Sequence, residues 1–366
     1  HRAFSITERI IFYVLAFIMF VSGLTLLSNL NSKFLVTVPD HGGSITEGVI
    51  GVPRFVNPVL AISDPDKDLA TLVFSGLLKK NASGVVIGDL SSEYTISPDG
   101  KTYTFTLKDD IYFHDGEPVT TDDVEFTVEQ IQNPTIKSPK RPVWEGVLIK
   151  KIDSRRISFT LKQSYAPFID NFTVGIIPKH LWKDVPPDEF SFSEHNIQAI
   201  GSGPFKIKSV ERNSYGLPTY YELRAFGDYA LGKPYVKTLI LSFYQDENLL
   251  FEDFKKGDVD SMSGVSPEKL AELTNPETAV VSSALPRVFG IFFNQNQATV
   301  FVNKEVREAL AVAINKEKIV AEVLHGYGNV ISSPVPAYNT IASTTSPTDA
   351  LSRTDRALAI LSKAGW

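Results

Sequence analysis

The chain of 366 residues contains no cysteine, and this absence excludes several kinds of site. Disulfide bonds, thiolate zinc sites, iron–sulfur clusters and cysteine nucleophiles all need that residue. The cysteine of a lipoprotein lipobox is missing too, so we expect no lipid anchor. An excess of positive charge is also missing, because 42 acidic side chains outnumber 36 Lys and Arg and give a net charge of −6. Since phosphate backbones are held by clustered Lys and Arg, we expect no nucleic-acid partner.

Signatures of catalysis are scarce. The sequence contains no G-x-S-x-G, no G-x-x-x-x-G-K-[ST], no G-x-G-x-x-G and no H-E-x-x-H motif, and its six histidines form no pair at metal-ligand spacing. His114 and Asp115 are adjacent, but neighbouring strand residues point to opposite faces, so we expect a structural role in a turn. Asp122 and Asp123 fit the start of a helix, where carboxylates meet the positive dipole end. We therefore expect no enzyme activity, no metal and no cofactor.

The amino-terminal part of the sequence is strongly apolar. Ile10–Leu27 is an 18-residue stretch without charge, near the lower limit for a helix that spans a membrane. Arg2 and Arg9 precede it, and positive charge on that side predicts a cytoplasmic amino terminus with the remainder exported. A cleaved signal peptide is the alternative, but no good small-x-small cleavage site follows. We predict a membrane anchor or signal segment at residues 1–30 and a tether at residues 31–43.

The rest of the sequence mixes strand and helix signals. Tyr103–Leu107 and Ile157–Leu161 alternate apolar and polar residues, which is the period of half-buried strands. Thr120, three residues before Asp123, indicates a capping box at the start of a helix. Val306–Ile314 carries its apolar residues on one helical face. Because these elements follow no regular strand–helix–strand rhythm, the pattern favours an α/β or α+β architecture with more than one lobe.

One long block of the sequence carries a family signature. It runs from Gly88–Leu90 through Ser97–Lys108 and continues as Phe113–Thr120 and Asp123–Val124. With its spacing intact, this block resembles the family 5 extracellular solute-binding proteins, the peptide-binding components of ABC importers. Further segments keep the order of that family; they are 42–45, 54–58, 73–78, 201–205, 232–235, 256–260, 293–294, 306–316 and 364–366. The resemblance covers residues 44–366.

The resemblance implies an α/β fold of the bilobal periplasmic-binding-protein type (class II). Two lobes of such a protein close around a hinge, and the ligand stabilises the closed state by its extra affinity for it. The expected division places lobe I at residues 44–286, with an inserted subdomain at about 88–195, and the start of lobe II at residues 287–366. Family members continue beyond the last matched motif, so the resemblance implies a chain that is truncated in the second lobe.

The resemblance also implies a set of residues that face the cleft. The implied ligand-binding residues are Phe55, Val56, Asn57, Ser263, Gly264, Arg287, Phe289 and Asn294. The first three lie in the opening loop of the domain, the next two end a strand, and the last three lie near the expected crossing between the lobes. Arg287 suits a bidentate pair with a ligand carboxylate. For each residue, packing within a loop or an exposed charge is the alternative.

The expected function is that of a substrate-binding protein of an ABC importer. It would bind an oligopeptide or dipeptide between the lobes and deliver it to the permease subunits, from the periplasm or the cell surface, while anchored to the cytoplasmic membrane by its amino-terminal helix. Main-chain hydrogen bonds to an extended peptide would allow varied side chains. One alternative is a membrane-anchored sensor or adhesion module with the same clamp fold. Another is a binder of a different small solute, such as a nickel chelate or a sugar.

Overall fold

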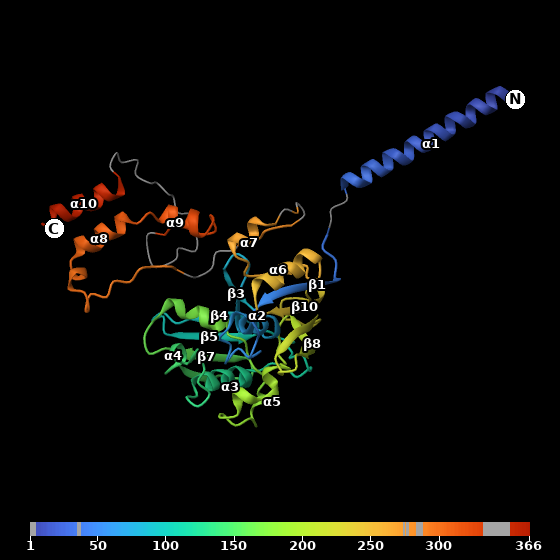
Figure 1. The fold of residues 1–366 in the computed structure, drawn as a ribbon. Helices are drawn as coiled ribbons and strands as arrows, with labels where there is room; N and C mark the ends of the chain where they lie inside the picture. The colour runs from blue at the N-terminus through green and yellow to red at the C-terminus, as the bar shows by residue number, and fades with distance from the viewer. Residues whose placement is uncertain (1–4, 35–37, 274, 276–277, 283–287, 332–351) are drawn as a thin grey trace.

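The computed structural model describes residues 5–34, 38–273, 275, 278–282, 288–331 and 352–366 of the chain. A 29-residue helix, α1 (Ile6–Phe34), extends away from the folded body (Figure 1). Its segment Ile6–Leu27 has a mean hydropathy of 2.6, and none of it is buried. The predicted apolar segment is therefore helical and long enough to cross a membrane, a test that signal sequences also pass.

One mixed sheet contains the first strand of the body. Its strands are β1 (Gly42–Ile50), β8 (Phe205–Arg212), β9 (Pro218–Ala225), β10 (Val236–Tyr244) and β11 (Ser261–Met262). They lie in the order β11–β1–β10–β9–β8, with β1 parallel to both of its neighbours. The helix α6 (Glu247–Lys256) joins β10 to β11 and contacts β1, so it crosses over the strand that separates them. Parallel strands need a crossover of this kind.

A second, antiparallel sheet lies within residues 91–160. Its strands are β4 (Ser91–Ile96), β5 (Thr102–Leu107), β6 (Leu148–Lys151) and β7 (Arg156–Thr160), in the order β4–β5–β7–β6. The two strands predicted from alternation correspond to β5 and β7 and are confirmed to within one residue. Along β5, Tyr103, Phe105 and Leu107 are buried while the threonines between them stay partly exposed.

Helices and a short hairpin surround the two sheets. They are α2 (Asp64–Val73), β2 (Leu78–Lys80), β3 (Val86–Gly88), α3 (Thr121–Gln132), α4 (Arg141–Trp144), η1 (Ala166–Thr173), α5 (Lys179–Trp182), η2 (Phe190–Phe192) and η3 (Glu194–Asn196). The predicted capping box of α3 is confirmed, since the Thr120 N–H donates to the Asp123 carboxylate at 2.9 Å. His114 and Asp115 turn to different partners, and so do not share a site: His114 bonds to Gly201 and Gly203, and Asp115 to His180.

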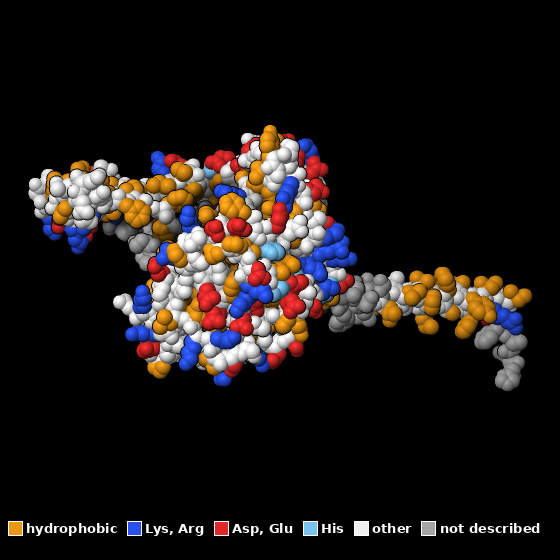
Figure 2. Space-filling view, turned by 90° about the horizontal axis from the view of Figure 1, so that it is seen from below, with side chains coloured by type: hydrophobic (Ala, Val, Ile, Leu, Met, Phe, Trp, Pro, Cys, Tyr) orange, Lys and Arg blue, Asp and Glu red, His pale blue; other side chains and the backbone are white. Residues whose placement is uncertain are grey.

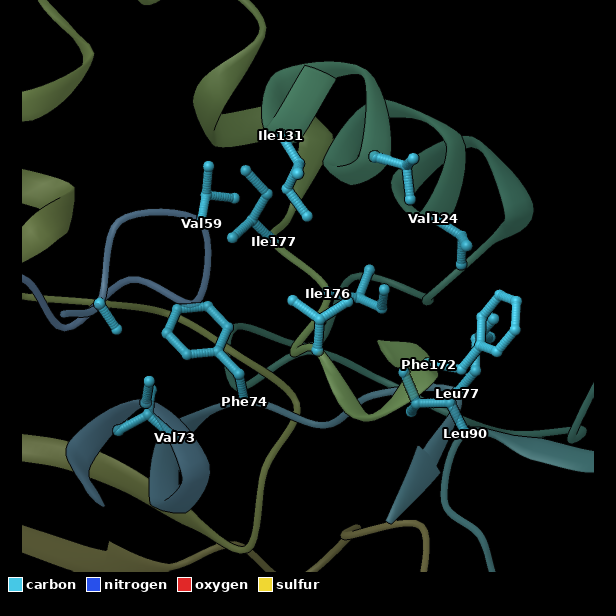
Figure 3. Packing of buried hydrophobic residues seen from close by; sticks show 14 of the residues in the cluster. Val59, Val73, Phe74, Leu77, Leu90, Val124, Ile131, Phe172, Ile176 and Ile177 are labelled. Carbon is cyan, nitrogen blue, oxygen red and sulfur yellow. The ribbon is translucent and has the colours of Figure 1, made fainter. Parts of the chain in front are cut away.

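A single hydrophobic core joins these elements. Side chains from α2, α3 and the segment around residues 172–177 point toward one another in its centre (Figure 3). Phe172 lies at the middle of an aromatic group, with its ring centroid 4.5 Å from that of Phe105, 5.0 Å from that of Phe159 and 5.6 Å from that of Trp144. Tilted and edge-to-face contacts at these distances add stabilisation beyond the burial of area.

The carboxyl-terminal helices lie to one side of this core (Figure 1). They are α7 (Pro267–Ala271), η4 (Thr299–Val302), α8 (Lys304–Ala313), α9 (Lys316–Val323) and α10 (Arg353–Lys363). The helix predicted at Val306–Ile314 is confirmed as α8, and its buried Val306 and Ala309 lie on the face that contacts α10. The domain limits predicted at residues 44–286, about 88–195 and 287–366 stay predictions.

Candidate functional site

The parallel strands β10, β1 and β11 end at one edge of their sheet, and open α/β sheets bind ligands outside the carboxyl ends of such strands. Ile50 at the end of β1 pairs with Tyr244, and Gly48 pairs with Met262. A Cβ atom on Gly48 would meet the end of the Leu250 side chain of α6, so glycine at this position lets the helix pack closely against β1. The strand β1 at this edge is thus packed closely against α6.

The loop that follows β1 is held by one buried carboxylate. Asp66 of α2 is 2% exposed. Its Oδ1 accepts the backbone N–H groups of Arg54 and Phe55 at 2.7 and 3.0 Å. Its Oδ2 accepts those of Ile62 and Ser63 at 3.3 and 3.1 Å. Hydrogen bonds to a charged acceptor are stronger than neutral ones, so Asp66 fixes both ends of the loop against α2.

Glu47 of β1 and Asp68 of α2 lie close enough for the charge of Asp68 to act on the Glu47 carboxyl. Burial raises the pKa of the Glu47 carboxyl, and the nearby charge of Asp68 raises it further, while a hydrogen bond from Ser263 acts against both. Burial also raises the pKa of Asp68, and Asp64 adds to the effect. Like charges in a partly desolvated place favour an added cation or proton. The surroundings of these two carboxyl groups therefore suit a positively charged group.

A hollow of about 450 Å³ opens beside α2, within the size range of small-molecule sites. Ala70, Thr71 and Phe74 of the helix line it together with Trp144. Its charged lining residues are Lys67, Lys79, Lys80, Lys140, Asp89 and Asp170. Four lysines against two aspartates make this wall net positive, although the chain as a whole is net negative.

Lys140 is a lysine of this wall for which the described residues supply no counter-ion. Lys80 pairs with Asp170 at 2.8 Å and Lys67 with Asp64 at 3.3 Å. No ion pair of Lys140 is found within the described ranges. Burial lowers the pKa of its ammonium group, and the charge of Lys67 lowers it further. An anionic ligand group placed between the two ammonium groups would relieve this repulsion.

A buried carboxyl group, Asp89, belongs to the same wall. It is 3% exposed, and its Oδ1 has no hydrogen-bond partner among the described residues. Burial raises the pKa of Asp89, while Lys79, Ser75 and the more distant Lys108 act in the opposite direction. The ammonium group of Lys79 in turn donates to the Tyr229 hydroxyl at 2.9 Å. Lys79 is therefore engaged inside the wall, and Lys140 is the lysine that we expect to meet a ligand.

The opening loop predicted to face the cleft is largely turned inward. Val56 is 1% exposed and Asn57 is fully buried. The Asn57 amide donates to the side chain of Asn196 at 2.9 Å, and its Oδ1 accepts the Val59 N–H at 2.8 Å. Phe55 is half-buried, with the Arg54 guanidinium 5.4 Å from the centre of its ring. These contacts hold the loop, and a ligand contact of the three residues stays a prediction.

The other predicted residues lie in two separate places. Ser263 and Gly264 follow β11 at the carboxyl edge of the sheet, where Ser263 bonds to Glu47 and Gly264 is exposed. Phe289 is 87% exposed, and the Asn294 side chain accepts the N–H groups of residues 296 and 297 in a local turn. Arg287 lies outside the described residues. Among those that are described, no hydrogen bond joins Phe289 or Asn294 to the opening loop.

Sequence reasoning missed the residues around α2. Lys67 and Asp68 follow the capping residue Ser63, and charged residues at such positions are typical of the exposed first turns of a helix. Lys140 follows a Ser-Pro pair in a loop, with no motif or period around it. Only the folded chain brings Lys140 next to Lys67, so no local pattern identifies the pair.

The family comparison decides the membership of the chain. The family described as bacterial extracellular solute-binding proteins, family 5 Middle, matches residues 85–366. The chain belongs to this family. The resemblance found in the sequence is confirmed, and so is the fold class, because the related structures are bilobal periplasmic binding proteins of mixed α/β content.

Three similar proteins illustrate the relationship. The oligopeptide-binding protein AppA of Bacillus subtilis is 30% identical over 314 residues, which are 84% of this chain and 56% of AppA. The structure of that protein with a nonapeptide has a TM-score of 0.68 at 27% identity, and covers 90% of this chain and 65% of AppA. The nickel-binding periplasmic protein of Escherichia coli is 28% identical over 81% of this chain and 56% of its own. The chain thus spans little more than half the length of these curated relatives.

Proposed function

We propose that the chain is the ligand-binding component of an ABC importer, which binds a peptide in a cleft between two lobes and delivers it to a permease. Its family membership supports this function, and so does its similarity to an oligopeptide-binding protein. We further propose that α1 anchors the body to the outer face of the cytoplasmic membrane, because its apolar segment of 22 residues is long enough to span one.

The single observation that carries the peptide proposal is the charge arrangement around α2. Asp68 of the helix lies close to Glu47 of β1, while Lys67 of the helix and Lys140, which has no ion pair among the described residues, line the hollow. A peptide at neutral pH has an ammonium group at one end and a carboxylate at the other. We propose that the peptide lies across α2 with its ammonium end toward Glu47 and its carboxylate end in the hollow.

The binding experiment uses peptides that differ only in their end groups. The purified protein is incubated with a mixed pool of short peptides, separated by gel filtration, and the retained peptides are identified by mass spectrometry. The same pool with acetylated amino ends and amidated carboxyl ends is the control. We expect free peptides to be retained and capped peptides to be lost, and equal retention of both pools would contradict the arrangement across α2.

A substitution tests the role of Lys140 directly. Lys140→Met keeps the length of the side chain and removes its charge, while Lys162→Met makes the same change at an exposed position away from the hollow. One hydrogen bond to a charged group is worth about 1.5–3 kcal/mol, so we expect Lys140→Met to weaken peptide binding by about 10- to 100-fold. Titration calorimetry measures the affinity of each variant for a peptide. An unchanged affinity would remove Lys140 from the site.

A second candidate ligand is a nickel chelate, because the nickel-binding protein of Escherichia coli is among the relatives. In the part of the chain that the structure describes, no group of three His, Asp or Glu side chains is arranged to hold a metal. A nickel ligand would therefore have to bring its own donor atoms. Titration with nickel and free histidine distinguishes a peptide ligand from a nickel chelate. Tight binding of the mixture without retention of peptides would favour the chelate.

A further inference from the structure

The tether is fixed to one end of the body. His41 Nδ1 lies 3.0 Å from the carbonyl oxygen of Pro234, and the His41 ring stacks on Tyr235 with 4.8 Å between centroids. The Gly42 N–H donates to the carbonyl oxygen of Tyr235 at 2.8 Å. The chain therefore enters the body at the connection between β9 and β10, at the end of the sheet opposite its carboxyl edge.

Exposed basic side chains gather at this end. Lys206 lies directly opposite Arg224 in the β8–β9 pair, and Lys233 and Lys237 flank the β9–β10 connection. Lys208, by contrast, is neutralised by Glu222 at 2.7 Å. Lys206, Lys233 and Lys237 make no ion pair with any residue that the structure describes. Figure 2 shows Lys and Arg side chains on the body beside the point where the tether joins it.

Apolar and aromatic side chains lie among these charges. Val38 in the tether is 73% exposed, Tyr235 is 56% exposed and Leu231 is 41% exposed. Asp40, Glu222 and Asp228 are the acidic residues close to them in the chain, and Glu222 lies 3.9 Å from Arg224. We call the set the tether pole; it consists of Val38, Lys206, Arg224, Leu231, Lys233, Tyr235 and Lys237. Tyr at the headgroup level and Lys near anionic lipids are typical of surfaces that meet a bilayer.

The length of the tether decides which end of the body lies near the membrane. From Leu27, where the apolar segment ends, to Phe34 the helix adds about 10 Å, and the eight residue steps from Phe34 to Gly42 span at most about 28 Å even when fully extended. A folded body of about 230 residues has a diameter of roughly 45 Å by the usual scaling of the radius of gyration. An anchored body therefore cannot turn its carboxyl edge to the membrane as easily as its tether pole.

We propose that the tether pole rests on the anionic surface of the membrane in which α1 is anchored. This inference rests on the proposed anchoring by α1. Lipid phosphates meet the unpaired lysines, Leu231 and Tyr235 enter the headgroup region, and the carboxyl edge of the sheet faces the solution. The body is then held in one orientation instead of tumbling on its tether.

The absence of cysteine makes this orientation measurable with a single label. Leu231→Cys in the tether pole and Tyr215→Cys at the tip of the β8–β9 hairpin each give one site for an environment-sensitive fluorophore. Each labelled full chain is reconstituted in vesicles of phosphatidylcholine with or without phosphatidylglycerol, both containing a lipid with a spin-labelled headgroup that quenches the fluorophore. We expect quenching at position 231 only, and only with the anionic lipid.

Charge removal gives the matched comparison. Lys206→Gln, Lys233→Gln and Lys237→Gln together remove three tether-pole charges, whereas Lys137→Gln, Lys162→Gln and Lys183→Gln remove three exposed charges elsewhere. Each lysine near an anionic surface changes the equilibrium by about five-fold, so the first triple variant is expected to lose the quenching and the second to keep it.

Two outcomes separate this inference from the anchoring on which it rests. If alkaline carbonate extracts the protein from the vesicles, the anchoring itself fails. If the protein stays in the vesicles but position 231 is not quenched, or position 215 is quenched equally, the anchoring holds and the membrane-facing tether pole is refuted.

Discussion

The Asp66 carboxylate offers the sharpest test of how the loop after β1 is held. In an Asp66→Asn variant the oxygen that remains still accepts two backbone N–H groups. The amide nitrogen, however, faces the N–H groups of Ile62 and Ser63, which lose their acceptor. Asp66 is 2% exposed, so the lost bonds are made to a largely buried acceptor. Each bond to a charged acceptor is worth at least about 1.5 kcal/mol, and we expect a loss of about 3 kcal/mol in the free energy of unfolding.

Urea unfolding of the full chain in a constant non-ionic detergent measures this loss, with the slope of the transition as a check that the unfolded state is unchanged. Asp68→Asn is the control for stability, because it makes the same chemical change two residues later on the same helix. Burial and Asp64 already raise the pKa of Asp68, so removal of its charge should not destabilise the fold. A loss below about 1 kcal/mol for Asp66→Asn, or an equal loss for Asp68→Asn, would refute the reasoning.

Two further predictions concern stability. A Cβ atom on Gly201 would lie 2.1 Å from the carbonyl oxygen of Val73, so Gly201→Ala should cost about 3 kcal/mol in urea unfolding, whereas Gly227→Ala, with open space around it, should cost little. Burial lowers the pKa of His114 to about 4, so the unfolded chain takes up a proton more readily, and stability should fall by about 3 kcal/mol as the pH drops from 6.5 to 4. Urea midpoints across this range should fall less for His114→Gln than for the parent; an identical slope would contradict the assignment.

Features of the fold that depend on neighbouring residues are visible in the sequence. The alternation in β5 and the capping box of α3 need only a few consecutive residues, and both are found where the sequence predicts them. The mixed sheet is different, because Gly42 of β1 pairs with Val236 and its other neighbour is β11. Only the family resemblance makes such a distant pairing predictable.

The candidate site was harder to predict for a physical reason. Val56 and Asn57 stand in a loop, and the sequence does not tell whether a loop residue faces solvent or caps a core. In the structure Asn57 is fully buried and satisfied by Asn196, which lies 139 residues away. Lys140 is a candidate ligand-binding residue because it lies near Lys67 and has no ion pair among the described residues. Both are properties of the folded chain.

The crossover of α6 over β1 has a consequence for the order of assembly. β1 leaves the ribosome early, yet its two partners are β10 and β11, so one of its edges stays open until residue 244 has been made and the other until residue 262 has been made. Closing so long a loop is slow, because its entropy must be lost before the pairing compensates it. We expect the amides of β1 to become protected late in pulsed hydrogen exchange, after those of the β8–β9 hairpin. The segment next to α1 is thus the last part of this sheet to complete its pairing.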